Sequence, residues 1–175
     1  IAKRFAMAQQ YDEAAGARGF GVSNVNPLLV ASVYGSLQAF GKAGGVRSLR
    51  RKSVLLTGYL EALLHARGLL ETALVTAEGK ANTKGRSGGA MLRLVTPADP
   101  KQRGCQLSLR VIPAPSGCAS GKPPVTMRAL EEALRERGVV GDAREPDTVR
   151  LAPTPLYNTF TDVWRAVAAL EDALH

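Results

Sequence analysis

The chain has 175 residues, a mass of 18.5 kDa and ordinary proportions of hydrophobic (45%) and charged (22%) residues, which excludes a disordered or fibrous protein. Its 23 basic and 15 acidic residues give a net charge of +8, which is compatible with an anionic partner but does not require one. The 2 cysteines and 2 histidines lack metal-ligand spacing and no apolar run has the length of a membrane span, so we expect no metal site, no membrane and a reducing compartment.

Two helices are predicted in the first half of the chain. Pro27 follows a polar loop and is placed as the first residue of a helix that runs to Ala43, where Gly44-Gly45 ends it. A longer helix over 46–67 follows, with Gly68 as its stop. Its apolar stripe consists of Leu49, Leu56, Leu60 and Leu63.

Strands and helices are predicted in the second half. After a basic, glycine-rich surface loop over 78–89, strands are expected at 91–96 and 106–111, the latter with strict polar–apolar alternation. An amphipathic helix over 125–137 precedes short strands at 139–140 and 148–152, and a capping box at 159–162 opens a last helix. The order predicts an α+β fold, with a small, mostly antiparallel sheet and helices packed on one face.

Arg150 interrupts an apolar, strand-like stretch directly before two prolines. Burying a guanidinium is costly unless it meets an anion, and its planar fork matches a carboxylate through two parallel hydrogen bonds. The pattern leaves two interpretations open: Arg150 binds the carboxylate of a ligand, or it pairs with an acidic residue of the chain. The candidates for such a pair are Asp142, Glu145 and Asp147.

A basic cluster lies on the predicted long helix and just before it. It consists of Lys42, Arg47, Arg50, Arg51 and Lys52. Such a patch is compatible with phosphate binding, but a solvated helix face is the more ordinary interpretation because aromatic residues for base stacking are scarce nearby. A non-catalytic α+β module that binds RNA or another polyanion is therefore an alternative function.

Five segments of this sequence resemble the C-terminal region of the kynureninase family. They are Gly19-Phe20 with Ser23-Asn24, Arg51–Leu60, Arg103–Leu107, Arg137–Val140 and Val149–Phe160, in this order over nearly the whole chain. Kynureninases are pyridoxal-phosphate enzymes of the aspartate-aminotransferase fold, so the chain resembles the last third of such an enzyme. The implied domains are the end of a large cofactor-binding domain with an active-site loop (1–27), linking helices (28–68) and a small C-terminal α+β domain (69–175).

The resemblance implies a reaction and its partners. The family hydrolyses the Cβ–Cγ bond of kynurenine or 3-hydroxykynurenine to alanine and an anthranilate, with pyridoxal phosphate as the electron sink. The implied partners are a small amino-acid substrate and a second subunit of a cytoplasmic homodimer, with no nucleic acid. Another enzyme of the same cofactor fold, such as a desulfurase, is disfavoured by the Pro155-Leu156-Tyr157-Asn158 stretch.

The resemblance also assigns residues. Arg150 matches the arginine that holds the substrate α-carboxylate, and Asn24 matches the asparagine at the cofactor and substrate ring. Ser23 beside it resembles the pair found in members that prefer the 3-hydroxylated substrate, since both side chains are short hydrogen-bonding groups. The lysine that carries the cofactor belongs to the large domain, so we expect no catalytic residue in this chain and no activity of the chain alone. Gly21 departs from the longer polar residue usual in the family.

Overall fold

The computed structural model describes residues 9–10, 14–21, 24–71, 73–75, 81–83, 90–114 and 124–174. The chain divides into two compact units, Ile1–Ala39 and Phe40–His175. The first unit holds a 3₁₀ helix, Gly16–Phe20, and most of helix α1, Pro27–Lys42. All further helices and strands belong to the second unit. The three-part organisation implied by the family resemblance stays a prediction.

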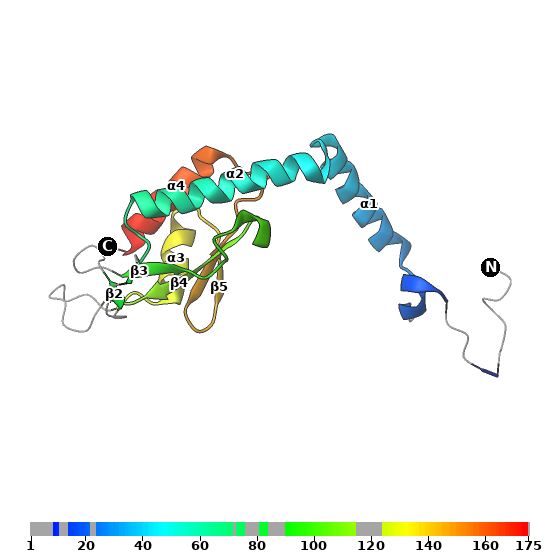
Figure 1. The fold of residues 1–175 in the computed structure, drawn as a ribbon. Coiled ribbons are helices and arrows are strands. Elements are labelled where there is room, and N and C mark those ends of the chain that lie inside the picture. The colour runs from blue at the N-terminus through cyan, green and yellow to red at the C-terminus, as the bar shows by residue number, and fades with distance from the viewer. Residues whose placement is uncertain are drawn as a thin grey trace. The chain divides into compact units, whose positions relative to one another are not determined.

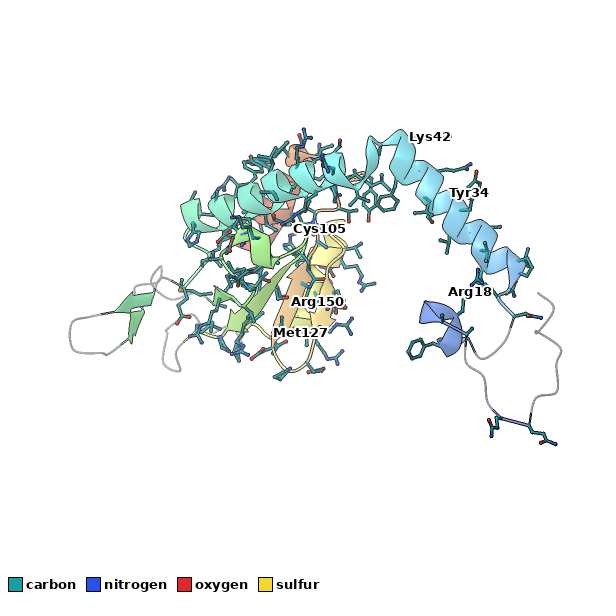
Figure 2. The ribbon with its side chains drawn as sticks, turned by 45° about the vertical axis from the view of Figure 1, so that its right-hand side comes forward. Arg18, Tyr34, Lys42, Cys105, Met127 and Arg150 are labelled. Atoms are coloured by element: carbon teal, nitrogen blue, oxygen red, sulfur yellow. The ribbon has the colours of Figure 1, made fainter. Side chains whose placement is uncertain are left out.

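Helix α1 begins where the sequence predicts. Pro27 is its first residue, and Asn26 Oδ1 accepts a hydrogen bond from the backbone N–H of Leu28 at 2.9 Å, which satisfies one of the free donors of the first turn. Gly44 and Gly45 have φ angles of +86° and +77°, a left-handed conformation that favours glycine and ends the helix. No residue of α1 is buried, and its side chains, including the labelled Tyr34, stand out from the ribbon in Figure 2.

The second unit is an α+β domain, as predicted. Its four-stranded sheet has the order β3-β4-β6-β5 with every neighbouring pair antiparallel (Figure 1). The strands are β3 (Met91–Leu94), β4 (Leu107–Ile112), β5 (Asp142–Arg144) and β6 (Thr148–Leu151). The helices are α2 (Gly45–Ala66), α3 (Met127–Glu136), α4 (Phe160–Leu174) and a 3₁₀ turn at Pro100–Gln102. Within the described part of the chain, no helix is long and apolar enough to cross a bilayer.

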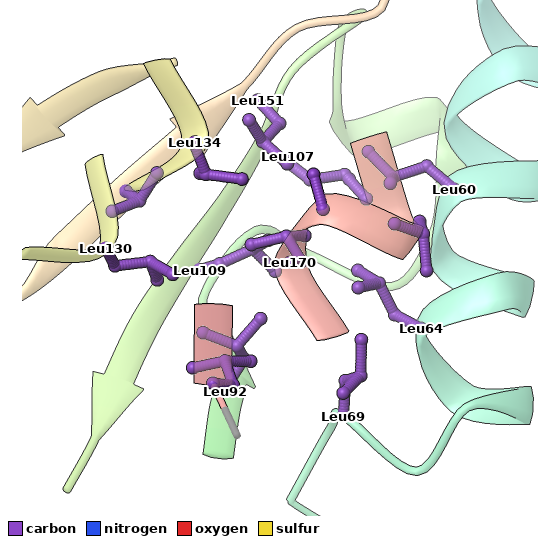
Figure 3. Packing of buried hydrophobic residues seen from close by; sticks show 14 of the residues in the cluster. Leu60, Leu64, Leu69, Leu92, Leu107, Leu109, Leu130, Leu134, Leu151 and Leu170 are labelled. Carbon is purple, nitrogen blue, oxygen red and sulfur yellow. The ribbon is translucent and has the colours of Figure 1, made fainter. Parts of the chain in front are cut away.

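The core lies between one face of the sheet and the helices. Leu107 and Leu109 of β4 alternate with polar neighbours and are fully buried, as the predicted period of two requires. Leu170 of α4 lies between these strand residues and Leu60 of α2 (Figure 3). Each such side chain contributes about 1.5–3 kcal/mol on burial, so α2 is part of this domain's core.

Helix α4 opens with the predicted capping box. The backbone N–H of Thr159 donates to Asp162 Oδ2 at 2.8 Å, and the N–H of Asp162 donates to Thr159 Oγ1 at 3.2 Å. These reciprocal bonds satisfy donors that the first helical turn leaves free. The predicted apolar stripe of α4 is buried throughout; its members are Val163, Val167, Leu170 and Leu174.

Three local predictions are wrong. The strand expected at 139–140 is absent: Val139 N–H bonds to the carbonyl of Leu134 in the C-terminal cap of α3, and the strand β5 starts at Asp142 instead. On α2 the predicted Leu49, Leu56 and Leu60 are buried, but the last buried leucine is Leu64, and Leu63 is only half-buried against the core. Residues 81–83, expected in a loop, form strand β2 and pair with β1, Ala73–Val75.

The predicted surface loop over 78–89 falls largely outside the described residues, which include only 81–83 of it. Ser23 also lies outside the described residues.

Candidate active site

Arg150 lies on the face of the sheet that the helices do not cover. In β6 its neighbours Val149 and Leu151 point into the core and are buried, so the pleat directs Arg150 to the opposite face. The arginine side chain is 30% exposed, and Figure 2 shows it on the sheet. The strand expected at 148–152 is therefore present, and Arg150 is half-buried on its face away from the core.

Asp142 is the acidic partner that the sequence left open. It lies directly opposite Arg150 in the β5–β6 register, and its Oδ2 accepts a hydrogen bond from Arg150 Nη2. The same oxygen also pairs with Arg144, at 3.1 Å from Nε and 3.0 Å from Nη2. Two guanidinium groups thus share one carboxylate, and this group of three side chains keeps a formal charge of +1.

One donor of the Arg150 guanidinium has no partner among the described residues. Its Nε is buried and makes no hydrogen bond to them, as is also true of Arg103 Nε, so this feature alone does not mark a ligand site. On its other side the register partner is Ser108 of β4. The backbone N–H of Ser108 donates to Thr96 Oγ1 at 2.8 Å. In the sheet Arg150 therefore lies between Asp142 of β5 and Ser108 of β4.

Gly141 allows β5 to approach β6 closely beside the site. A Cβ atom at Gly141 would lie 3.3 Å from the carbonyl oxygen of Arg150 and 3.3 Å from Leu151 Cδ2. Both distances are tighter than ordinary van der Waals contact, so a side chain at this position would require its neighbours to shift by a few tenths of an ångström. The absence of a side chain at Gly141 thus helps to bring Asp142 within reach of Arg150.

A cavity of about 340 Å³ lies on the helix side of the sheet. Leu60 of α2, Leu151 of β6 and Val163 of α4 are among its lining residues, and Arg150 is not. The cavity is therefore separate from the surface that carries Arg150.

Asn24 lies in the first unit, just before α1, and is exposed. No hydrogen bond from its side chain to another described residue is present, so the amide is available to donate to or accept from a ligand. The role that the family resemblance implies for Asn24 stays a prediction. Asn24 and Arg150 belong to different compact units.

A buried ion pair supports the loop that leads into β4. Arg103 is 3% exposed and its Nη2 lies 2.5 Å from Glu61 Oε2 of α2, while its Nη1 donates to the carbonyl of Pro97 at 3.2 Å. Sequence reasoning missed this pair, because residues 42 positions apart give no local signal. It also missed the sharing of Asp142, for which the Asp-x-Arg spacing on one strand face was an available signal.

The basic cluster of α2 is partly engaged within the domain. Arg50 donates to the carbonyl of Pro100 and to Ser53 Oγ, the latter at 3.3 Å. This tethers the 3₁₀ turn to α2. The contact gives Arg50 a structural role that needs no nucleic acid.

The fold and the site define a small α+β domain whose open sheet face presents a partly neutralised arginine. A family model described as the kynureninase C-terminal domain matches residues 80–170, more than half of the chain. The chain belongs to the kynureninase C-terminal domain family, which confirms the family resemblance seen in the sequence.

Full-length relatives extend the match to nearly the whole chain. The kynureninase of Stenotrophomonas maltophilia is 45% identical over 170 residues, which cover 97% of this chain and 33% of that protein. "Kynureninase 1" of Chaetomium globosum is 41% identical over 171 residues, 98% of this chain and 29% of that protein. The kynureninase of Monosiga brevicollis is 40% identical over 173 residues, which cover 99% of this chain and 32% of that protein. The chain spans about a third of the length of these relatives, and none of these names supports the alternative of an RNA-binding module.

Proposed function

We propose that this chain is the C-terminal part of an enzyme that hydrolyses kynurenine or 3-hydroxykynurenine to L-alanine and the corresponding anthranilate. The names of its relatives support this reaction. The observation that carries the assignment of the site is the guanidinium of Arg150 on the open sheet face, whose counter-ion Asp142 is shared with Arg144. Such a group fits the α-carboxylate of an amino acid.

The reaction adds one water across the Cβ–Cγ bond of the substrate. The ketone carbon becomes the carboxyl group of the anthranilate, and Cβ gains a proton to become the methyl group of alanine. Pyridoxal phosphate, when bound, supplies the electron sink that this cleavage needs. Arg150 binds the α-carboxylate and fixes the orientation of the amino-acid end, which lowers the entropic part of the barrier. Asn24 and Ser23 interact with the ring end of the substrate and with the cofactor.

The proposed enzyme needs protein beyond this chain. Helix α1 carries no charged residue before Lys42, and its large apolar side chains, such as Leu29 (65% exposed) and Leu37 (63% exposed), lie in solvent. A helix that is apolar on all sides is typical of a buried position. We place α1 against the other two thirds of a kynureninase, which include the lysine that carries the cofactor, and against a second subunit of a homodimer. The proposed location is the cytoplasm, in keeping with a sequence that has only 2 cysteines.

A chimeric enzyme tests this function. The chain replaces the corresponding third of the Stenotrophomonas maltophilia kynureninase, and the release of anthranilate from kynurenine is measured. We expect an active, pyridoxal-phosphate-loaded enzyme in which Arg150→Ala lowers kcat/KM by about 100-fold or more, because a charged, two-point hydrogen bond is lost. The absorbance of the bound cofactor stays unchanged, since Arg150 is assigned to the substrate.

Arg110→Ala is the matched control, because Arg110 lies on the same open face in β4 and pairs with Asp147 at 3.2 Å. We expect less than about a twofold change for it, as for most exposed ion pairs. Equal losses in the Arg110 and Arg150 variants, or no loss in the Arg150 variant, contradict the assignment. Asn24→Ala should change the preference between kynurenine and 3-hydroxykynurenine, and an equal loss for both substrates argues against its role at the ring.

A further inference from the structure

The geometry around Arg150 points to two further residues that prepare it for the substrate, an inference that rests on the proposed function. We infer that Asp142 is a positioning residue that holds the guanidinium of Arg150 on the open sheet face, and that Arg144 keeps Asp142 from neutralising it. Neither Asp142 nor Arg144 touches the substrate in this arrangement. They act through the orientation and the net charge of Arg150.

The first step of the argument is the position of Asp142. Side chains directly opposite each other on one face of an antiparallel pair lie within contact distance, and Asp142 is the register partner of Arg150. Its Oδ2 binds Nη2 of the guanidinium. A long arginine side chain has several rotamers whose loss costs free energy on binding. An ion pair that already selects one of them removes part of this cost.

The second step concerns charge. An arginine fully paired with one carboxylate presents little net charge to a ligand. Here the carboxylate of Asp142 is shared with Arg144, whose Nε and Nη2 lie 3.1 and 3.0 Å from the same oxygen. The group of two arginines and one aspartate therefore keeps one positive charge for the substrate carboxylate.

The same face of the sheet offers a comparison within the molecule. Arg110 of β4 pairs with Asp147, which also accepts a hydrogen bond from Thr148 Oγ1 at 3.0 Å. That aspartate is not shared with a second arginine among the described residues, and its pair is more exposed, at 45% for Arg110. The sharing of one carboxylate by two arginines distinguishes the Arg150 site from this ordinary surface pair.

The test uses the chimeric enzyme with two ligands that differ only in the carboxylate. These are kynurenine, as substrate, and its decarboxylated analogue kynuramine, as a competitive inhibitor. Asp142→Ala should raise KM for kynurenine about 10- to 100-fold, the range expected for a hydrogen bond to a charged group, with kcat changed less than about threefold. The inhibition constant of kynuramine should change less than twofold, since kynuramine does not use Arg150. Asp142→Asn, which keeps an oxygen acceptor, should restore most of the loss.

Arg144→Gln is the second variant, and it decides the matter if the alanine variant does not fold, because the Arg144 side chain is 59% exposed and tolerates change. Without Arg144, Asp142 neutralises Arg150 more fully, so KM for kynurenine should rise at least about threefold, again without an effect on kynuramine. Asp147→Ala is the control and should leave both constants unchanged. An unchanged KM in the Arg144 variant, or equal weakening of kynurenine and kynuramine in the Asp142 variant, overturns the inference.

Arg150→Ala separates this inference from the proposed function. If Arg150→Ala raises KM for kynurenine while Asp142→Ala and Arg144→Gln do not, only the positioning role fails. If Arg150→Ala itself leaves KM unchanged, the assignment of the carboxylate site fails, and the positioning role with it.

Discussion

Arg103, in the loop before β4, and Glu61 of α2 form an ion pair in which the arginine side chain is 97% removed from solvent, with 2.5 Å between Nη2 and Oε2. The pair fastens the loop over 95–106 to the long helix. This loop leads directly into β4, which is the strand next to Arg150 in the sheet. The ion pair therefore holds in place the start of a strand that borders the candidate site.

We expect Glu61→Ala to destabilise the domain by about 3–5 kcal/mol, because it leaves the buried guanidinium of Arg103 without a counter-ion. The free energy of unfolding, from urea titrations followed by circular dichroism, measures the change. Glu131→Ala removes the exposed pair with Arg135 on α3 and should cost about 0.5 kcal/mol or less. A similar cost for the two variants contradicts the structural role of the Glu61–Arg103 pair.

Gly141→Ala should destabilise the domain by about 1–3 kcal/mol, because the added Cβ lies 3.3 Å from a backbone oxygen of β6, which must shift to make room. It should also raise KM for kynurenine in the complete enzyme, since Asp142 moves with β5. Gly58→Ala is the matched control: it lies within α2 with nothing within 4 Å of its Cβ position. There the change should stabilise by about 0.5–1 kcal/mol. If both variants change the free energy of unfolding in the same direction, the close approach of β6 to Gly141 is not the cause of the destabilisation.

The capping box predicts a pH dependence of stability. The backbone N–H of Thr159, followed by its hydroxyl, donates to Asp162 and holds the pKa of that carboxyl below its ordinary value. A carboxyl whose pKa is lower in the folded state stabilises the fold above the pKa of the unfolded chain, and this stabilisation is lost as the pH falls through the folded-state value. We expect the loss below about pH 4.

Thermal unfolding measured between pH 7 and pH 3 checks this, with Asp162→Asn as the comparison. The variant should lose part of the acid-induced destabilisation seen in the unmodified chain. The remaining part includes Glu71, whose pKa is lowered chiefly by its hydrogen bond from Arg93. Parallel pH profiles for the variant and the unmodified chain would contradict the role of Asp162.

Helix α1 predicts self-association of the isolated chain. Its apolar residues Leu29, Val33 and Leu37 are each more than half exposed and follow one another on the helix, and neighbouring exposed apolar residues are typical of an interaction surface. Replacing Leu29, Val33 and Leu37 by glutamine should lower both the binding of a hydrophobic dye and the sedimentation coefficient. Leu55→Gln on α2, a single exposed leucine (61%), is the control and should change neither. No difference between the triple variant and the control would contradict the inference that α1 is normally covered by further protein.

The local pattern of the sequence determined the helices and the core. Pro27 and the Thr159–Asp162 pair define helix starts through chemistry within one turn. The alternation of Leu107 and Leu109 with polar residues defines which face of β4 is buried. These signals depend only on neighbours along the chain, so they can be read without the fold. The family resemblance also rests on local motifs, and the family model that matches residues 80–170 confirms it.

Only the tertiary structure decided which acidic residue meets Arg150. Asp142, Glu145 and Asp147 are similar in charge and in distance along the chain. The β5–β6 register places Asp142 opposite Arg150 and directs it to the same face, whereas Asp147 pairs with Arg110 of the other neighbouring strand. A shift of one residue in the register would reverse the faces. The charge left on Arg150 follows from this pairing between strands, which no local pattern encodes.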